Sequence, residues 1–340
     1  MKHRYVTIAL VLVTQANLSL FGQDGLSDLI DSAMQRAGDN AAQLRNALEN
    51  APNDQKEAVR FLIAHMPDRD LKSLSAQFLL TNVRFAYRAW SRAPWKDRIP
   101  KDIFLNDVLP YASINERRDD WREDFYNRFM PLVAGADSPS QAAAILNRKI
   151  FNILNVRFSR ARPKPDQSPY ESIKAQMASC TGLSVLLIDA CRAVAVPARF
   201  AGTPLWADRS GNHSWVEIWD GKWHFTGAAE PTADNLDRAW FTARAAKAQP
   251  DHRLHAIYAT SFKRTPLTFP LVWARRVDYV YAVNVTDRYA APRPPKTEPP
   301  PPTNASSRID LEASLHARAQ LKKYLNTPPD DRPALADREF

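Results

Sequence analysis

The sequence predicts an α+β fold in which helices and strands occupy separate parts of the chain, with a large helical N-terminal region. Residues 25–160 carry apolar side chains at helical spacing, which predicts a mainly helical region. Residues 161–290 instead show strand-like alternation, several tryptophans and turn signals. A third observation is an apolar helical run at residues 180–191, inside the strand-rich part.

The first residues are typical of an export signal. Lys2, His3 and Arg4 precede an apolar run over residues 6–13. A basic start followed by a short apolar segment predicts a signal peptide over residues 1–22, cleaved near residues 16–22, and an exported protein, periplasmic or extracellular. The alternative is a buried N-terminal strand or helix. Because the run is shorter than about 18 residues, we expect no stable membrane span.

Three segments predict helices within residues 25–160. Apolar residues recur at helical spacing over residues 58–62, 71–90 and 142–146, and the last of these follows a helix-start signal at residues 137–140. Residues 104–111 are less regular. After the strand-rich stretch, seven prolines over residues 292–302 predict an extended linker at 291–305. Residues 306–340 then predict a C-terminal helix, over 306–326, and a tail.

Composition excludes several classes of protein. With 45% hydrophobic residues the chain of 340 residues can form a core, so wholesale disorder is excluded. Two cysteines exclude a disulfide-rich scaffold and a four-cysteine zinc site. Neither GxGxxG nor GxxxxGK[ST] is present, which argues against a glycine-rich nucleotide loop. The formal net charge of +9 is scattered without a Lys/Arg-rich block, so no nucleic-acid partner is expected.

The two cysteines differ in their surroundings. Cys180 comes where a small, polar segment becomes the apolar helical run, so it is expected at a helix N-terminus. Free N–H groups and the helix dipole there lower a thiol pKa and can bind an oxyanion. The alternative for Cys180 is a small buried hydrophobe. Cys191 follows eleven residues later, about 16 Å along a continuous helix. That separation is too large for a disulfide, and Cys191 is expected in the core.

A β-hairpin is predicted around Asp220-Gly221, which separates two alternating runs. A two-residue loop gives a register that pairs Trp219 with Lys222, Glu217 with His224 and His213 with Ala228. His224 then forms a structural cross-strand pair with Glu217. Glu230 lies two residues beyond Ala228, on the same face as His213. A carboxylate in that position could orient the His213 ring and stabilise its imidazolium.

Four tryptophans surround this hairpin and are expected mainly in the core, although one of them could wall a cleft: Trp206, Trp215, Trp219 and Trp223.

The order of the motifs resembles the transglutaminase-like superfamily. The pieces that carry the resemblance are Ser179-Cys180-Thr181-Gly182, Val196-Pro197-Ala198-Arg199, His213-Ser214-Trp215-Val216-Glu217 and the segment from Trp223 to Glu230-Pro231. The resemblance implies a papain-like Cys-His-Asp/Glu core, in which the helix that bears the nucleophile packs on an antiparallel sheet. It implies Cys180 as the nucleophile and His213 as the base.

The acid of the triad departs from the family pattern. The resemblance places an Asp about four residues after the tryptophan of the second strand, and that position is Gly227. An acid-proline pair follows three residues later as Glu230-Pro231. Both this pair and the shared face with His213 select Glu230 as the third catalytic residue.

Together with the predicted export signal, the resemblance implies an exported thiol enzyme that cleaves or transfers at an amide bond through a Cys180 thioester. The simplest form is a cysteine protease that acts on a protein or peptide substrate and needs no cofactor or metal. A protein-glutamine acyltransferase and an N-glycan amidase use the same triad and stay open, as does a non-catalytic binding protein of the same fold. A zinc site from Cys180, His213 and His224 is poorly spaced.

Overall fold

The computed structural model describes residues 25–232 and 235–290, which belong to one compact unit. The predicted signal peptide at 1–22, the linker at 291–305 and the C-terminal helix and tail at 306–340 lie outside the described residues. In the described ranges, none of the helices has the length and apolar character that crossing a membrane requires.

The N-terminal region is helical, as predicted. Residues 25–37 form its first helix, and the others are α2 (Ala41–Asn50), α3 (Lys56–His65), α4 (Asp68–Leu71), α5 (Ala76–Arg92), α6 (Lys101–Ile103), α7 (Arg122–Phe129) and α8 (Pro139–Ile153). The predicted start of α8 is confirmed, because the Ser138 side chain accepts a hydrogen bond from the Gln141 N–H at 3.2 Å. The less regular stretch contains a π-helical turn, Phe104–Val108.

The second part of the fold is an antiparallel sheet of six strands in the order β5-β4-β3-β6-β8-β7. Its strands are β3 (Ala198–Thr203), β4 (His213–Asp220), β5 (Lys222–Thr226), β6 (Tyr258–Thr260), β7 (Leu267–Thr268) and β8 (Tyr281–Asn284). The short strands β1 (Arg157–Phe158) and β2 (Met177–Ala178) form a separate parallel pair. Two further helices are α9 (Pro169–Ala175) and α11 (Thr242–Ala245).

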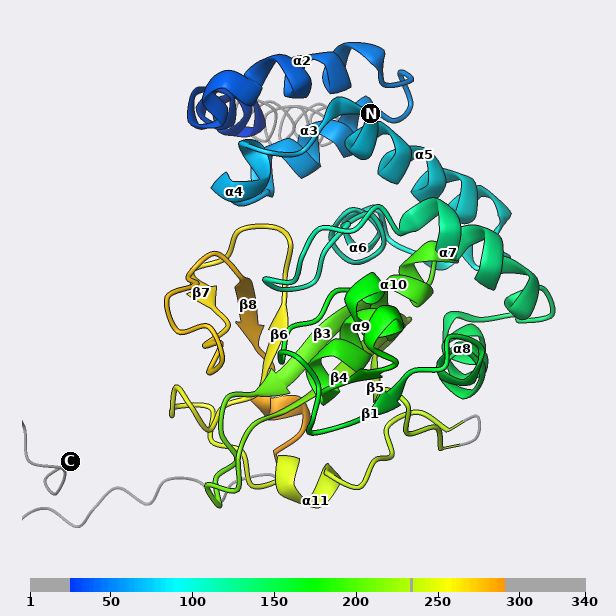
Figure 1. The fold of residues 1–340 in the computed structure, drawn as a ribbon, viewed down its shortest axis with the longest axis vertical. Helices are drawn as coiled ribbons and strands as arrows, with labels where there is room; N and C mark the ends of the chain where they lie inside the picture. Colours follow the sequence, from blue (N-terminus) through cyan, green and yellow to red (C-terminus); the bar gives the residue numbers. More distant parts are fainter. Residues whose placement is uncertain (1–24, 233–234, 291–340) are drawn as a thin grey trace, which may run out of the picture. The chain divides into compact units, whose positions relative to one another are not determined.

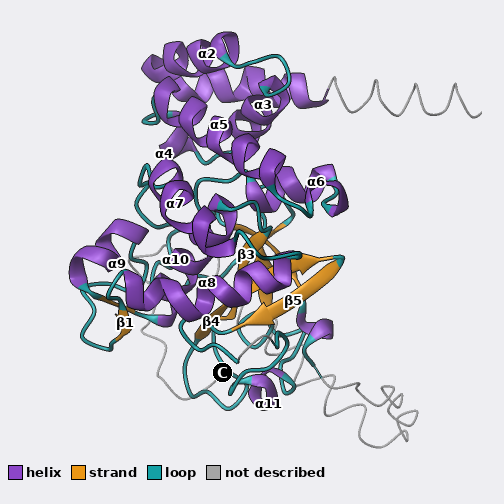
Figure 2. Ribbon diagram, turned by 90° about the vertical axis from the view of Figure 1, so that its right-hand side faces the viewer, coloured by secondary structure: helices purple, strands orange, loops and turns teal. Residues whose placement is uncertain are grey.

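Helix α10 (Cys180–Ala193) occupies the centre of the molecule, between the sheet and the N-terminal helices (Figures 1 and 2). All its residues after Cys180 are buried, as expected for a helix that is covered on every side. The predicted α+β fold, with the nucleophile helix packed on an antiparallel sheet, is therefore confirmed.

The two faces of β4 have different neighbours because side chains alternate along a strand. Val216 and Ile218 join the main core on the α10 side. Trp215 joins a second cluster with Trp206 and Phe241. His213 shares the face of Trp215, whereas Ser214 faces α10. His213 and Cys180 thus lie at the N-terminal end of β4 and at the N-terminal end of α10.

The predicted hairpin register is wrong by one residue. Asp220 pairs with Lys222 and leaves Gly221 alone in the turn, so Glu217 pairs with Phe225 and Trp219 with Trp223. Gly221 has φ of 74°, a conformation that glycine adopts without strain. The tighter turn shifts every later pair, and the ladder ends at Val216 and Thr226.

The partners of Glu217 and His224 differ accordingly from the prediction. The Glu217 carboxylate is buried and accepts hydrogen bonds from Arg199 at 2.8 Å and from Arg288 at 2.7 Å. His224 Nδ1 lies 2.6 Å from an Asp237 carboxylate oxygen. The predicted pair of His224 with Glu217 and the pairing of His213 with Ala228 are therefore not formed.

Candidate active site

Cys180 is the first residue of α10, as predicted. The Ser179 side chain caps the helix by accepting a hydrogen bond from the Gly182 N–H at 3.2 Å. Cys180 is half-buried, whereas Cys191 is fully buried, and both are free thiols. The predicted contrast between a cysteine at the helix start and a core cysteine is confirmed.

The expected low pKa of the Cys180 thiol is not found. Burial raises the pKa, because a thiolate loses hydration when it leaves water. The N–H and hydroxyl groups of Ser214 and Thr181 donate toward the sulfur and lower the pKa in part. Burial outweighs them, and it depends on tertiary packing that the helix-start pattern does not contain.

His213 begins β4, where it pairs with Thr203 of β3. Its ring is packed among aromatic side chains, with the Phe241 ring centroid at 4.9 Å and that of Trp206 at 6.0 Å. Burial, together with the positive charge of Arg244, lowers the pKa of His213 to about 4. The Nε2 atom is buried and has no hydrogen-bond partner among the described residues.

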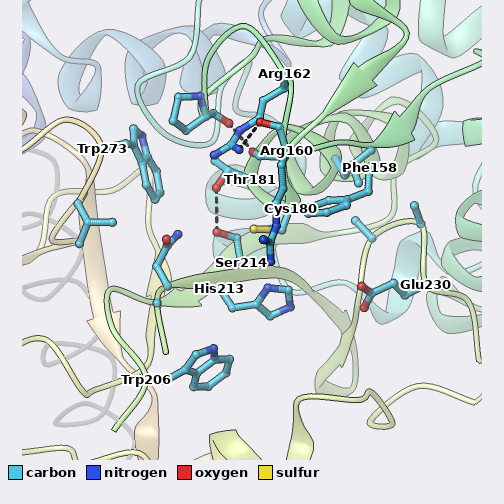
Figure 3. A pocket seen from close by; sticks show the side chains of 18 of the residues that line it. Phe158, Arg160, Arg162, Cys180, Thr181, Trp206, His213, Ser214, Glu230 and Trp273 are labelled. Carbon is cyan, nitrogen blue, oxygen red and sulfur yellow. Dashed lines mark hydrogen bonds between the residues drawn. The ribbon is translucent and has the colours of Figure 1, made fainter. Parts of the chain in front are cut away.

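One cavity of about 670 Å³ brings Cys180, His213 and Glu230 together (Figure 3). A hydrogen bond of 3.0 Å between the Thr181 and Ser214 hydroxyls joins the start of α10 to β4. It fixes the residues that directly follow Cys180 and His213. In the described part of the chain no hydrogen bond connects Cys180 with His213. Catalytic hydrogen bonds are often formed only once substrate is bound.

Glu230 reaches this cavity from a turn after β5. The Glu230 N–H donates to the Gly227 carbonyl at 3.3 Å, and Ala229 has φ of 62°. The chain therefore reverses at this point and returns the Glu230 side chain over Gly227. A Cβ atom on Gly227 would collide with the Glu230 carboxylate. The carboxylate thus occupies the space of a side chain at position 227, where the family resemblance implied an acid.

Trp240 lies between Glu230 and His213. The Trp240 indole N–H donates to Glu230 Oε2 at 2.9 Å, and its ring centroid lies 4.8 Å from that of His213. In Figure 3 the Glu230 carboxylate is on the side of the His213 ring away from Trp206. Among the described residues, Glu230 has no direct hydrogen bond to His213. Burial raises the pKa of the Glu230 carboxyl group.

Asn147 of α8 holds the turn that carries Glu230. Its amide nitrogen donates to the Gly227 carbonyl at 2.8 Å and to the Thr226 hydroxyl at 3.1 Å. Its amide oxygen accepts from the Ala229 N–H at 2.9 Å. Sequence reasoning missed this residue. The available signal was a single polar side chain on the apolar face of a predicted helix, beside Ala143, Leu146 and Ile150.

Of the four tryptophans, Trp206 lines the cavity, as expected for one of them, and Trp215 is fully buried. Trp240 lines the cavity as well. It was missed because it lies beyond the recognised motifs. Within residues 25–232 and 235–290, no three His, Cys, Asp or Glu side chains are grouped to hold a metal ion.

One comparison, with models of protein families, gives a match that includes Cys180 and His213. Residues 128–228 match the model of the Transglutaminase-like superfamily. No curated protein sequence matches the chain. A crystal structure from Cytophaga hutchinsonii, named "Putative Cysteine Protease", aligns with a TM-score of 0.28 and 19% identity, over 32% of this chain and 38% of that chain. The family match supports a thiol enzyme. The match includes Cys180 at the start of α10 and His213 at the start of β4, so residues 128–228 are similar to the transglutaminase-like superfamily.

Proposed function

We propose that this protein is an exported thiol hydrolase that cleaves amide bonds in peptides or proteins through a Cys180 thioester. The observation that carries the proposal is that Cys180, His213 and Glu230 line the same cavity, with Cys180 at a helix N-terminus. A thiol, a base and a carboxylate are the groups that nucleophilic amide cleavage needs.

The first half of the reaction forms the thioester. Burial keeps the Cys180 thiol and the His213 ring neutral at rest. His213 therefore accepts the thiol proton as the sulfur attacks the amide carbonyl carbon. The carbonyl electron pair moves to oxygen and then returns as the C–N bond breaks, while His213 gives its proton to the departing amine.

The second half regenerates the thiol. Water attacks the thioester carbonyl and gives a proton to His213, and the C–S bond then breaks to release a carboxylic acid. The sulfur recovers its proton from His213. In both halves the negative oxygen forms beside the N-terminus of α10, where the Cys180 N–H and the helix dipole stabilise it.

Glu230 serves to orient His213 and to stabilise its positive form. The buried Nε2 atom lacks a partner, and the Glu230 carboxylate lines the same cavity. The Trp240 indole N–H binds Glu230 in the structure, so a direct bond from Glu230 to the ring requires Trp240 to move. The negative charge of the carboxylate offsets the free-energy cost of a buried, positively charged imidazole during the reaction.

The test compares the full-length protein with Cys180→Ala in a digest of mixed peptides, with products identified by mass spectrometry. Cys191→Ala is the matched control, since Cys191 is the other free cysteine and does not line the cavity. We expect cleavage by the wild type and by Cys191→Ala, and none by Cys180→Ala. Cleavage that survives in Cys180→Ala, or no cleavage by any of the three, overturns the proposal.

Two further readouts define the reaction and the location. A labelled primary amine is added to the same digest, and incorporation of the amine in place of hydrolysis would assign acyl transfer instead. N-terminal sequencing of protein recovered outside the cytoplasm tests export. We expect the mature chain to begin after a cut near residues 16–22.

A further inference from the structure

The cavity that contains Cys180 has an unequal distribution of charge. Arg160, Arg162 and Arg244 line it, and Glu230 is the acidic residue among its lining side chains. Arg244 has a partner outside the cavity, because its Nε lies 3.6 Å from an Asp208 carboxylate oxygen. Among the described residues, no carboxylate lies within ion-pair distance of Arg160 or Arg162. These two guanidinium groups are therefore available to an anionic ligand.

The loop that carries Arg160 and Arg162 is attached at both ends to the residues that flank Cys180. At one end the Ser159 N–H donates to the Ala178 carbonyl at 2.9 Å, next to the pairing of β1 with β2. At the other end the Ser179 hydroxyl donates to the Pro165 carbonyl at 2.6 Å. The positions of both arginines are thus tied to the position of the nucleophile.

A hydrogen bond inside the loop constrains it further. Arg162 Nη1 donates to the Arg160 carbonyl at 2.9 Å, which turns the Arg162 side chain back over its own loop. Arg162 is half-buried and Arg160 is exposed. A loop that is already ordered loses less entropy when a ligand binds, so it can contribute to selectivity.

Figure 3 shows on which side of Cys180 these arginines lie. The loop of Arg160 and Arg162 lies on the side of Cys180 away from the rings of His213 and Trp206, and the Arg160 side chain extends from this loop past Cys180. In amide cleavage the base protonates the departing amine, so the amine part of the substrate lies toward His213. The acyl part then lies toward Arg160 and Arg162.

We propose that this cavity selects peptides with an aspartate or glutamate side chain on the acyl side of the cleaved bond, and that Arg160 and Arg162 bind this carboxylate. The inference rests on the proposed amide-cleaving function. Guanidinium groups form strong, charge-assisted hydrogen bonds with carboxylates. The exposed rings of Phe158 and Trp240, which also line the cavity, offer contact surface to neighbouring apolar parts of the peptide.

The test measures binding in the absence of turnover. The full-length Cys180→Ala protein is titrated with hexapeptides that are acetylated and amidated at their ends, so that they carry no terminal charge. The peptides are alanine-rich and differ at one position, which is Glu, Gln or Lys. We expect the Glu peptide to bind about tenfold more tightly than the Gln peptide, and the difference to shrink as salt is added.

The assignment to Arg160 and Arg162 is tested by Arg160→Gln/Arg162→Gln in the same Cys180→Ala background. We expect this variant to bind the Glu and Gln peptides equally. Arg157→Gln is the matched control, because Arg157 is an exposed arginine at the start of the same segment and does not line the cavity. It is expected to keep the full preference for the Glu peptide.

Several results would overturn the inference: equal binding of the Glu and Gln peptides, a preference for Lys, binding of none of the peptides, or a preference that survives in the double variant. Failure of the two proposals can be told apart. Cleavage of peptides without acidic preference removes the inference and leaves the hydrolase. Selective binding of the Glu peptide to a protein that cleaves nothing removes the hydrolase and leaves the carboxylate site.

Discussion

The charge states of Cys180 and His213 depend on burial and on one neighbouring cation. Both side chains lose hydration in the cavity, so the neutral thiol and the neutral imidazole are favoured. Arg244 adds to this effect, because its positive charge disfavours the positive form of His213. Removal of that charge by Arg244→Gln should therefore raise the pKa of His213 from about 4 toward the ordinary histidine value.

The expected increase in the pKa of His213 is about half a pH unit, because Arg244 is a partly exposed cation. It can be followed by NMR of the histidine ring in the Cys180→Ala protein. This background removes the coupling to the thiol. Lys247→Gln is the control, because Lys247 is an exposed cation three residues further on that does not line the cavity. A midpoint that stays constant or falls in Arg244→Gln would contradict the electrostatic role of Arg244.

The local pattern was sufficient to place Cys180 at a helix start, and the family resemblance selected His213, which lines the same cavity. The protonation of these residues could not be predicted in the same way. The Cys180 thiol has the expected donors nearby, yet burial reverses the expected direction of its pKa. The burial of His213 likewise depends on a segment that is distant in the sequence, because Trp240 and Phe241 pack against its ring.

At the scale of elements, the turn after β5 determines where the carboxylate lies. Glu230 folds back over Gly227 and needs the space that a larger residue at 227 would fill. We expect Gly227→Ala to displace the Glu230 carboxylate and to lower kcat about tenfold or more, because small misplacements of catalytic groups are costly. The measurement is steady-state kinetics on a cleaved peptide, beside Glu230→Gln.

Gly135→Ala is the matched control, since a Cβ at Gly135 meets no atom within 4 Å. Gly227→Ala and Glu230→Gln should show the same loss, and the double variant should lose no more than either one. Full activity in Gly227→Ala would show that the carboxylate is not needed in its present position. Independent, additive losses would show that Gly227 acts on something other than Glu230.

Element-scale prediction was partly successful. The hairpin at Asp220-Gly221 exists, but its turn is one residue tighter than assumed, and a change of one residue exchanges the faces of every later pair. The predicted shared face of His213 and Glu230 depended on that register and is not formed, although Glu230 does line the same cavity as His213. Glu230 reaches the cavity through a turn held by Asn147 of α8, by hydrogen bonds across 80 and 82 positions that local patterns do not encode.

At the scale of the whole molecule, the N-terminal helices are built into the sheet-bearing part. The Trp95 indole N–H donates to the Ala195 carbonyl at 2.8 Å, just after α10. The buried Arg122 guanidinium donates to the Arg192 carbonyl at 2.9 Å and to carbonyls of residues 108–110. The helical character of residues 25–160 was predictable from periodicity. These long-range contacts were not, because each joins a polar group to a backbone carbonyl that has no sequence signature.

The buried side chain of His65 should make the stability of the molecule depend on pH. His65 ends α3 and is buried, with no partner for its Nδ1 atom among the described residues. Burial, together with the positive charges of Lys263 and Arg264, lowers the pKa of His65 to about 4. The folded protein therefore resists protonation between pH 6.5 and pH 4, whereas the unfolded chain takes up a proton. The stability contributed by neutral His65 is complete above the unfolded pKa of 6.5 and is lost as the pH falls toward 4.

The expected loss from His65 is about 3 kcal/mol for a lowering of this size, so the wild type should lose about that much more than His65→Phe. The loss from His213, whose pKa burial also lowers, is present in both proteins and cancels. Urea unfolding at pH 7, 5.5 and 4 measures the difference between the two proteins. Asp107, whose pKa burial raises to about 6, acts with the opposite sign but is present in both and cancels. His252→Phe, a substitution of an exposed histidine, should follow the wild type. If wild type and His65→Phe lose stability in parallel on acidification, then His65 does not make the stability of the molecule sensitive to pH.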